Sequence, residues 1–257
     1  AGFIDYLIAD RVVIPCEQTN HYSEKIIYLP HSYQVNDDTR TISDNVISRT
    51  EAGLPEDGFV FCCFNNSFKI GPDEFAIWMR LLQQVPGSVL WLYNSNVATK
   101  KNLHKQAQQR GVQPERVVFA DRMQHSEHLA RHRLADLFLD TFNYNAHTTA
   151  SDALWAGLPV ITKAGKGFAA RVAASLLNAV GLPELVTSSG SEYEQLALDL
   201  ALNPGRLGAL RAKLAANRRS APLFNSGLFT KHLEDAYQQA YQKYFQGDAP
   251  DSILVQP

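Results

Sequence analysis

The chain of 257 residues is long enough for one large domain or two small ones. Hydrophobic residues make up 45% and charged residues 19%, which is the composition of an ordinary globular protein, and a formal net charge of −2 leaves no basic footprint for nucleic acid. No apolar run approaches the roughly 20 residues that cross a bilayer, so neither nucleic-acid binding nor a membrane span is expected.

The first 50 residues contain two strand-like runs and then a polar segment. The runs are Phe3–Asp10 and Lys25–Leu29, and residues 36–49 have the composition of a loop or interlobe linker. The chain begins in a strand-like run without an initiator methionine. We therefore expect it to be a piece of a longer protein.

From Gly58 the pattern becomes regular, with strands and helices alternating to about Val186. The predicted strands are Phe59–Phe64, Val89–Tyr93, Arg116–Phe119, Leu134–Asp140, Leu158–Thr162 and Leu185–Val186. The predicted helices between them are Pro72–Gln84, Val97–Arg110, Ser126–Arg133 and one that begins near His147. Such alternation predicts an α/β fold with a parallel sheet covered by helices on both faces.

After Ser189 the chain turns helical. The predicted helices are Glu192–Leu202, Pro204–Arg218 and Leu228–Phe245, and we expect residues 250–257 to be a frayed tail.

The three cysteines, Cys16, Cys62 and Cys63, are too few for a disulfide framework. Two of them are neighbours inside a predicted apolar strand. Since the chain also has no signal peptide, we expect buried thiols in a reducing, cytoplasmic compartment.

The stretch Asn145–Gly157 joins a predicted strand to a predicted helix, and its polar residues stand where the helix begins. Helix N-termini carry free N–H groups and a partial positive charge, so they hold phosphate well. Here His147, Thr148 and Thr149 add side-chain donors, and Asp152 places an acid one turn into the helix, where it would suit ribose hydroxyls. The alternative is an ordinary threonine N-cap with Asp152 in the first turn, which stabilises any helix.

The pattern His-Thr-Thr-x-x-Asp-x-Leu-Trp-Ala-Gly in this stretch resembles the hallmark of the second catalytic lobe of protein O-GlcNAc transferases. Further matches follow in the same order along nearly the whole chain: Tyr22–Lys25, Leu29–His31, Gly53–Asp57, Phe64–Asn65, Phe68–Ile70, Ser88–Leu92, Arg171–Ser175 and Ser220–Asn225. The chain is similar to a bacterial member of that family, without the large insertion that animal members carry between their lobes.

This resemblance implies a GT-B-type, Rossmann-like lobe with a helical C-terminus. Residues 1–50 would be the terminal strands of the N-terminal catalytic lobe plus the interlobe linker. Residues 51–227 would be the C-terminal nucleotide-sugar-binding lobe, and residues 228–257 a helix packing back toward the N-terminal lobe, with a tail.

Asn66 and Lys69 follow the first strand of the regular part. Ligands of open α/β sheets bind beyond the carboxyl ends of strands, and a lysine there can meet a diphosphate, although an exposed loop lysine is the commoner case. The resemblance implies that Lys69 is the family's essential phosphate-binding lysine and therefore catalytic. Asn66 falls where related enzymes often have glutamine, and it would contact the donor with a shorter reach.

His125, His128 and Arg131 stand at three-residue spacing and share a helix face, which by itself fits a solvated surface or, weakly, a metal site. The resemblance implies that His128 lies against the nucleotide base and Arg131 beside the diphosphate region, while His125 replaces a lysine of the animal members. Tyr144 falls in the sugar pocket, where animal members have a small cysteine. This larger side chain leaves the identity of the donor sugar open.

The segment Gly165-x-Gly167-x-x-Ala170 follows a predicted strand, as a dinucleotide-binding fingerprint does. That fingerprint requires an acid at the end of the next strand, whereas Glu184 precedes it. We favour a glycine-rich loop near the donor phosphates, in which Arg171 is either structural or contributes charge.

No Asp-x-Asp stands in a predicted loop, and Asp136 and Asp140 belong to a strand-like segment. We therefore expect no metal ion and no cofactor, with Lys69 and helix N-termini carrying the phosphate charge. The resemblance implies transfer of N-acetylglucosamine from UDP-GlcNAc to serine or threonine hydroxyls of proteins, with inversion. The family's conserved histidines of the first lobe are absent from this chain, which would be inactive alone.

Two alternatives stay open. In the first, the same fold uses UDP-glucose, or GDP-fucose as in the related Spindly branch. In the second, it binds nucleotides without turnover. The expected partners are a nucleotide sugar, a protein or peptide acceptor, and the N-terminal catalytic lobe. Tetratricopeptide repeats of the same protein would lie upstream of residue 1.

Overall fold

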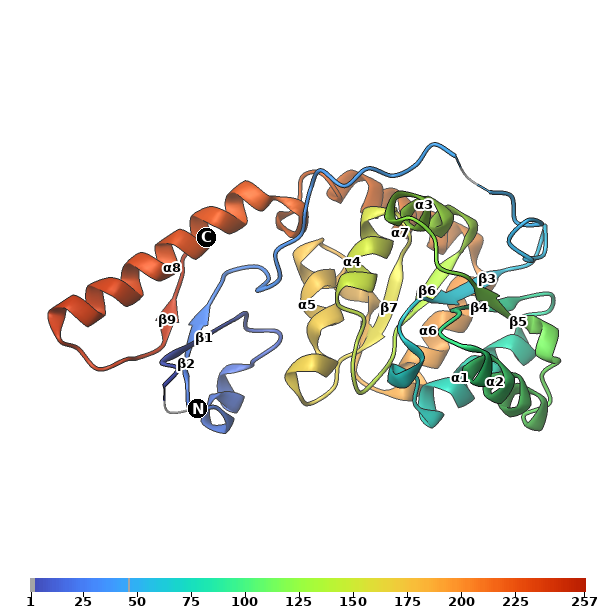
Figure 1. The fold of residues 1–257 in the computed structure, drawn as a ribbon, viewed down its shortest axis with the longest axis horizontal. Coiled ribbons are helices and arrows are strands. Elements are labelled where there is room, and N and C mark those ends of the chain that lie inside the picture. Colours follow the sequence, from blue (N-terminus) through green and yellow to red (C-terminus); the bar gives the residue numbers. More distant parts are fainter. Residues whose placement is uncertain (1–2, 46) are drawn as a thin grey trace.

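The computed structural model describes residues 3–45 and 47–257 (Figure 1). The strands are β1 Tyr6–Ala9, β2 Lys25–Tyr28, β3 Val60–Cys63, β4 Val89–Tyr93, β5 Val117–Ala120, β6 Leu137–Leu139, β7 Val160–Lys163, β8 Val186–Thr187 and β9 Ile253–Leu254. The α-helices are α1 Pro72–Gln84, α2 Val97–Gln109, α3 His125–Arg131, α4 Thr148–Trp155, α5 Val172–Ala179, α6 Gly190–Leu202, α7 Pro204–Asn217 and α8 Ser226–Gln246. They surround two parallel sheets, one of six strands in the order β5-β4-β3-β6-β7-β8 and one of three in the order β1-β2-β9.

The six-stranded sheet forms the larger body of the molecule. Its central strand β3 is buried along its whole length, as an apolar strand covered on both faces must be. Helix α1 begins at Pro72, where the backbone N–H of Gly71 donates to Oε1 of Glu74 at 2.8 Å. It packs against α6, whereas α3, α4 and α5 form a second layer in which each contacts the next or the sheet. The predicted α/β fold is confirmed.

The strand order reverses between β3 and β6. From β3 the chain proceeds through β4 to β5 at one edge, and from β6 it proceeds through β7 to β8 at the other. The connections that follow β3 and β6 therefore run in opposite directions and leave a crevice beyond the carboxyl ends of these two strands. Open α/β sheets bind ligands at such a point. The segments that begin at Phe64 and at Asp140 leave the sheet at this point.

The three-stranded sheet is completed by the last residues of the chain. Ile253 of β9 pairs with Ile27 of β2, and both Ile253 and Val255 are buried. Helix α8 covers this sheet and contributes Ala236 to its small core. The prediction of a frayed tail at residues 250–257 was wrong. Ile253 and Val255 pack against residues of β2 and α8, and this apolar surface exists only once the chain has folded.

The segment between the two sheets has neither helix nor strand over residues 36–45 and 47–49, as predicted; Val46 lies outside the described residues. Cys62 and Cys63 are buried in β3, but Cys16 is exposed in a 3-10 helix, Cys16–His21, so the expectation of buried thiols was wrong for Cys16. Of the helices that the structure describes, none is long and apolar enough to cross a membrane.

Candidate functional site

Lys69 lies on a short 3-10 helix, Ser67–Lys69, just beyond the carboxyl end of β3. Its ammonium donates to the backbone carbonyl of Asn145 at 3.0 Å and lies 3.8 Å from the centre of the Tyr144 ring. The Tyr144 ring in turn lies 4.9 Å from the ring of His147. Partial burial lowers the pKa of Lys69 from its usual value. The structure thus brings together three residues that the sequence analysis singled out, from segments more than 70 residues apart.

The loop between β6 and α4 is held by one buried carboxylate, Asp140. It accepts hydrogen bonds from the backbone N–H groups of Thr141 at 2.8 Å and Ala146 at 2.6 Å, and from the Thr162 hydroxyl at 2.7 Å. Complete burial raises the pKa of Asp140 to about 7, and these hydrogen bonds oppose the rise. Because Asp140 fixes both ends of residues 141–146, it sets where Lys69 and the start of α4 meet.

Helix α4 begins without a threonine cap. Its N-cap residue is His147, which makes no capping hydrogen bond through its side chain and instead places Nε2 3.2 Å from the carbonyl oxygen of Ala169. The alternative of a threonine N-cap is therefore wrong, since Thr148 and Thr149 occupy the first two helical positions. The first turn keeps its N–H groups without a side-chain cap, as anion-binding helix ends do.

Two neighbouring asparagines after β3 have different surroundings. Asn65 is buried, accepts a hydrogen bond from the Thr149 hydroxyl, and donates to the Thr141 hydroxyl at 2.8 Å. Asn66 is exposed and lines the large pocket described next. Asn65 is thus a structural link between β3, β6 and α4 that the sequence analysis did not assign, although it belongs to a matched motif.

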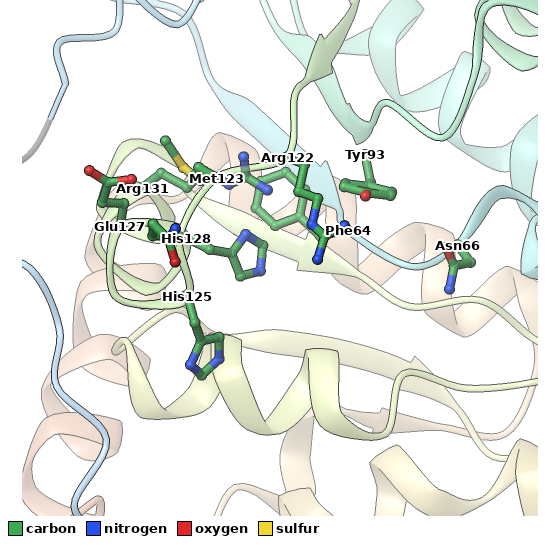
Figure 2. A pocket seen from close by; sticks show the side chains of 10 residues that line it. Phe64, Asn66, Tyr93, Arg122, Met123, His125, Glu127, His128 and Arg131 are labelled. Atoms are coloured by element: carbon green, nitrogen blue, oxygen red, sulfur yellow. The ribbon is translucent and has the colours of Figure 1, made fainter.

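A pocket of about 960 Å³ opens beside this cluster (Figure 2). Its lining residues are Phe64, Asn66, Tyr93, Arg122, Met123, Gln124, His125, Glu127, His128 and Arg131. Figure 2 shows Asn66 at the end remote from Glu127, with His125 pointing toward the helix below it. Four of the residues singled out in the sequence therefore line one pocket: Asn66, His125, His128 and Arg131. Lys69, Tyr144 and the residues of α4 do not line it.

Aromatic rings form the inner wall of this pocket. The His128 ring lies 5.3 Å from the Phe64 ring and 4.8 Å from the His132 ring, and burial together with neighbouring cationic side chains lowers the pKa of His128 to about 2. The Arg131 guanidinium lies 4.6 Å over the Phe64 ring and donates to the carbonyl of Asp121 at 2.6 Å. Burial lowers the pKa of Arg131 to about 10. A neutral imidazole beside flat apolar rings is suited to stacking on a planar heterocycle.

Asp152 is nearly buried and has two partners. Its Oδ1 accepts from Nη1 of Arg40 at 2.5 Å, and its Oδ2 lies 3.4 Å from Nε2 of His125. Burial raises the pKa of Asp152, while Arg40 and then His125 oppose this rise. Arg40 comes from the segment between the sheets and was not anticipated from the sequence.

The glycine-rich segment, Gly165–Ala170, contacts the loop between β6 and α4, since the N–H of Asn145 donates to the carbonyl of Ala169 at 2.8 Å. The N–H of Gly165 donates to the carbonyl of Ala170 at 2.7 Å, and a Cβ at Gly165 would stand 2.6 Å from that of Ala170, so only glycine fits. Arg171 donates to two backbone carbonyls, those of Val12 and Gly165, and is structural. Glu184 forms an ion pair with Lys213 before β8 begins, which speaks against a dinucleotide fingerprint.

No group of three or more His, Cys, Asp or Glu side chains among residues 3–45 and 47–257 is arranged to hold a metal ion. Asp136, one of the two strand-segment acids noted above, instead forms ion pairs with Arg49 at 2.9 Å and Arg211 at 3.0 Å. These contacts lie before β6 begins, at the opposite end of the strand from Asp140.

The model of glycosyl transferase family 41 matches residues 1–46 and 39–233 of the chain. Among curated proteins, the chain is 40% identical over 261 residues to a probable UDP-N-acetylglucosamine–peptide N-acetylglucosaminyltransferase, SEC, of Arabidopsis thaliana; the match covers 99% of this chain and 27% of that protein. It is 38% identical to the UDP-N-acetylglucosamine–peptide N-acetylglucosaminyltransferase of Caenorhabditis elegans, covering 80% of this chain and 18% of the relative. The chain therefore spans about a quarter of the length of these relatives or less.

Solved structures include a similar protein of the same kind. A mutant of the Thermobaculum terrenum O-GlcNAc transferase superposes with a TM-score of 0.81 at 32% identity, covering 95% of this chain and 46% of that one. Anabaena HepE in complex with UDP superposes with a TM-score of 0.60 at 16% identity, covering 84% of this chain and 57% of that one. At such low identity the second match shows a shared fold alone.

Proposed function

Because the chain belongs to glycosyl transferase family 41, we propose that it is the donor-binding part of an inverting enzyme that moves N-acetylglucosamine from UDP-GlcNAc to serine and threonine hydroxyls of proteins. Residues 1–50 and 228–257 would belong with an N-terminal catalytic lobe, and residues 51–227 would form the nucleotide-sugar lobe. Tetratricopeptide repeats would precede them in the whole protein. The names of the relatives from Arabidopsis and Caenorhabditis support the donor and the acceptor class.

One observation carries this proposal: a half-buried lysine and an uncapped helix N-terminus meet at the switch point of the sheet, beside a pocket walled by aromatic rings. The pocket would take the uracil against His128. The diphosphate would lie between Lys69 and the first turn of α4, near Thr148 and Thr149. Asp152 and His125 would face the ribose, and Tyr144 the sugar.

In the reaction, the acceptor hydroxyl attacks the anomeric carbon from the side opposite the diphosphate. The new carbon–oxygen bond forms as the bond to the β-phosphate oxygen breaks. The acceptor hydroxyl releases its proton to solvent, and the leaving UDP takes up negative charge. Lys69 and the N–H groups of α4 lie where that charge develops and stabilise it. The rest of the rate enhancement comes from positioning donor and acceptor in line.

A second donor, UDP-glucose, is favoured by one residue. Tyr144 is 42% exposed, and its ring stands against Lys69, where the sugar adjoins the diphosphate. A ring of this size leaves less room for an N-acetyl group than a small side chain would.

Titration calorimetry with UDP, GDP, UDP-GlcNAc and UDP-glucose tests the proposal. We expect UDP to bind and GDP to bind at least tenfold more weakly, and UDP-GlcNAc to bind more tightly than UDP-glucose. If UDP-glucose binds more tightly than UDP-GlcNAc, UDP-glucose would be the assigned donor. Absence of UDP binding, or a UDP complex whose density lies away from Lys69 and α4, would refute the site.

A further inference from the structure

Arg40 is held by contacts of both its side chain and its backbone. Its Nη1 donates to Asp152, its Nη2 lies 3.2 Å from the Ser151 hydroxyl, and its backbone carbonyl accepts a hydrogen bond from the Trp155 indole at 3.0 Å. The guanidinium also lies over the rings of Trp155 and Phe224, at 5.7 and 5.8 Å. With its side chain 11% exposed, this arginine is part of the packed structure around α4.

The backbone that carries Arg40 is itself fixed. The N–H of Thr39 donates to the carboxylate of Asp37 at 2.8 Å, and Nε of Arg40 donates to the Asp37 carbonyl at 3.0 Å. Four residues earlier, the Asn36 side chain accepts a hydrogen bond from the Ser151 hydroxyl and donates one to the carbonyl of Leu223 at 3.2 Å. The segment is therefore tied to α4 at two successive points, so its arginine has a defined direction.

The two oxygens of Asp152 consequently have different surroundings. Oδ1 is turned to Arg40, and Oδ2 is turned to His125, whose side chain is 56% exposed and lines the large pocket. A carboxylate whose side chain is 6% exposed can rotate only if both contacts break. Arg40 thus determines which oxygen stands on the pocket side.

We propose that Arg40 is a positioning residue for nucleotide recognition: by holding Oδ1 of Asp152, it leaves Oδ2, beside His125, to accept a hydrogen bond from the ribose 2′-hydroxyl of the donor. This inference rests on the proposed UDP site and extends it to a segment outside the nucleotide-binding lobe. A guanidinium fits this role because it can bond the carboxylate and the Ser151 hydroxyl at once, which a lysine ammonium on one flexible stem does less well.

The alternative is that Arg40 only fastens the linker. The two roles differ in how the ligand responds. A fastening residue affects every ligand of the pocket alike, whereas a residue that acts through Asp152 affects only ligands with the ribose hydroxyl that Asp152 holds. UDP and 2′-deoxy-UDP differ in that one group.

The test is calorimetric titration of the chain with UDP and with 2′-deoxy-UDP, for the wild type, Arg40→Gln, Asp152→Asn, the double variant and Arg40→Lys. Arg206→Gln is the matched control, because Arg206 on α7 forms an ion pair at the surface with Asp199 on α6, away from the site. We expect Arg40→Gln to weaken UDP about tenfold and 2′-deoxy-UDP less than about twofold, the size of one charge-assisted hydrogen bond. The double variant should resemble Asp152→Asn, since both remove the same contact.

Arg40→Lys should recover part of the discrimination, and Arg206→Gln should bind both ligands as the wild type does. Equal weakening of UDP and 2′-deoxy-UDP in Arg40→Gln, or unchanged binding of both, overturns the positioning role while leaving the UDP site intact. If the wild type binds neither ligand, the proposed function fails and this inference falls with it.

Discussion

The ammonium of Lys69 lies 3.8 Å from the centre of the Tyr144 ring while it donates a hydrogen bond to the carbonyl of Asn145. Both contacts come from the loop that Asp140 holds in place, so the lysine is oriented before any ligand arrives. The ring and the carbonyl compensate part of the cost of burying its charge. At the proposed leaving-group position, such a preset cation would need no rearrangement as the reaction proceeds.

Lys69→Ala in the full-length enzyme is expected to lower kcat by about 10²–10³ and to weaken UDP binding far less, because the lysine meets charge that grows in the transition state. Steady-state kinetics and UDP titration measure the two effects separately. Lys105→Ala, an exposed lysine of α2, is the control. Near-normal turnover combined with weak UDP binding would contradict the assigned role.

Tyr144→Ala in the full-length enzyme is expected to raise the ratio of kcat/KM for UDP-GlcNAc over UDP-glucose, because removing the ring opens space beside Lys69. Tyr144→Phe keeps the ring and should leave this ratio near the wild-type value. Initial rates measured with UDP-GlcNAc and with UDP-glucose give this ratio for each variant. An unchanged ratio in the alanine variant would show that the ring does not border the sugar.

The stability of the chain is expected to fall as the pH drops below about 6.5, in part through His128. The pKa of this ring is about 2 in the folded state, so between pH 6.5 and 2 the unfolded chain binds a proton that the folded chain does not. Each such group lowers the free energy of unfolding by up to ~1.4 kcal/mol per pH unit. His128→Phe should flatten the pH dependence measured by urea unfolding.

His132 supplies a matched comparison, since its pKa is lowered to about 4 by burial. His132→Phe should flatten the same profile only between about pH 6.5 and 4, and leave the slope at lower pH unchanged. A wild-type slope in both variants would mean that neither ring stays neutral in the folded protein.

Ile253→Ala is expected to lower the free energy of unfolding by about 2–4 kcal/mol, as the loss of a buried aliphatic side chain does. Its neighbour Leu254 is 45% exposed, and Leu254→Ala should change stability by no more than ~0.5 kcal/mol. Urea unfolding of the two variants tests the pairing of β9 with β2. Similar small effects at both positions would indicate that the end of the chain does not pack as described.

The chain alone is expected to bind UDP weakly and to transfer no sugar, because the acceptor would be approached from a lobe that residues 1–35 are too few to build. Phe3 and Ile4 are 85% and 47% exposed, so we also expect the chain alone to have limited solubility. A peptide glycosylation assay with and without the upstream region in trans measures the first point. Transfer by residues 1–257 on their own would place the chemistry elsewhere.

Local signals predicted much of the fold. The helix Pro72–Gln84 and the strand Val89–Tyr93 have the predicted bounds, because a proline at the first helical position and an unbroken apolar run mark them. The strand Ile253–Leu254 escaped prediction, since a two-residue strand has no periodicity. Its partner lies more than 220 residues earlier.

Site residues could be predicted where their role follows from their place after a strand or in a motif. They could not be predicted where their role depends on a contact with a residue far away in the sequence. Lys69 and the start of α4 were expected near each other from their places after two strands and from the family resemblance. The contact between Arg40 and Asp152 spans 112 residues of sequence, and no spacing rule links them. Likewise, nothing local distinguishes the buried Asn65 from the exposed Asn66.

The pairing of β9 with β2 also orders events during synthesis. Of the strands described here, β1 and β2 are made before the others but meet their third strand only after residue 255 has emerged, whereas every strand of the six-stranded sheet is available by residue 187. Ile27 and Leu29 therefore stay uncovered while the larger body folds. A nascent chain stalled before α8 would carry a complete six-stranded sheet and an exposed apolar edge, which is the kind of surface that chaperones bind.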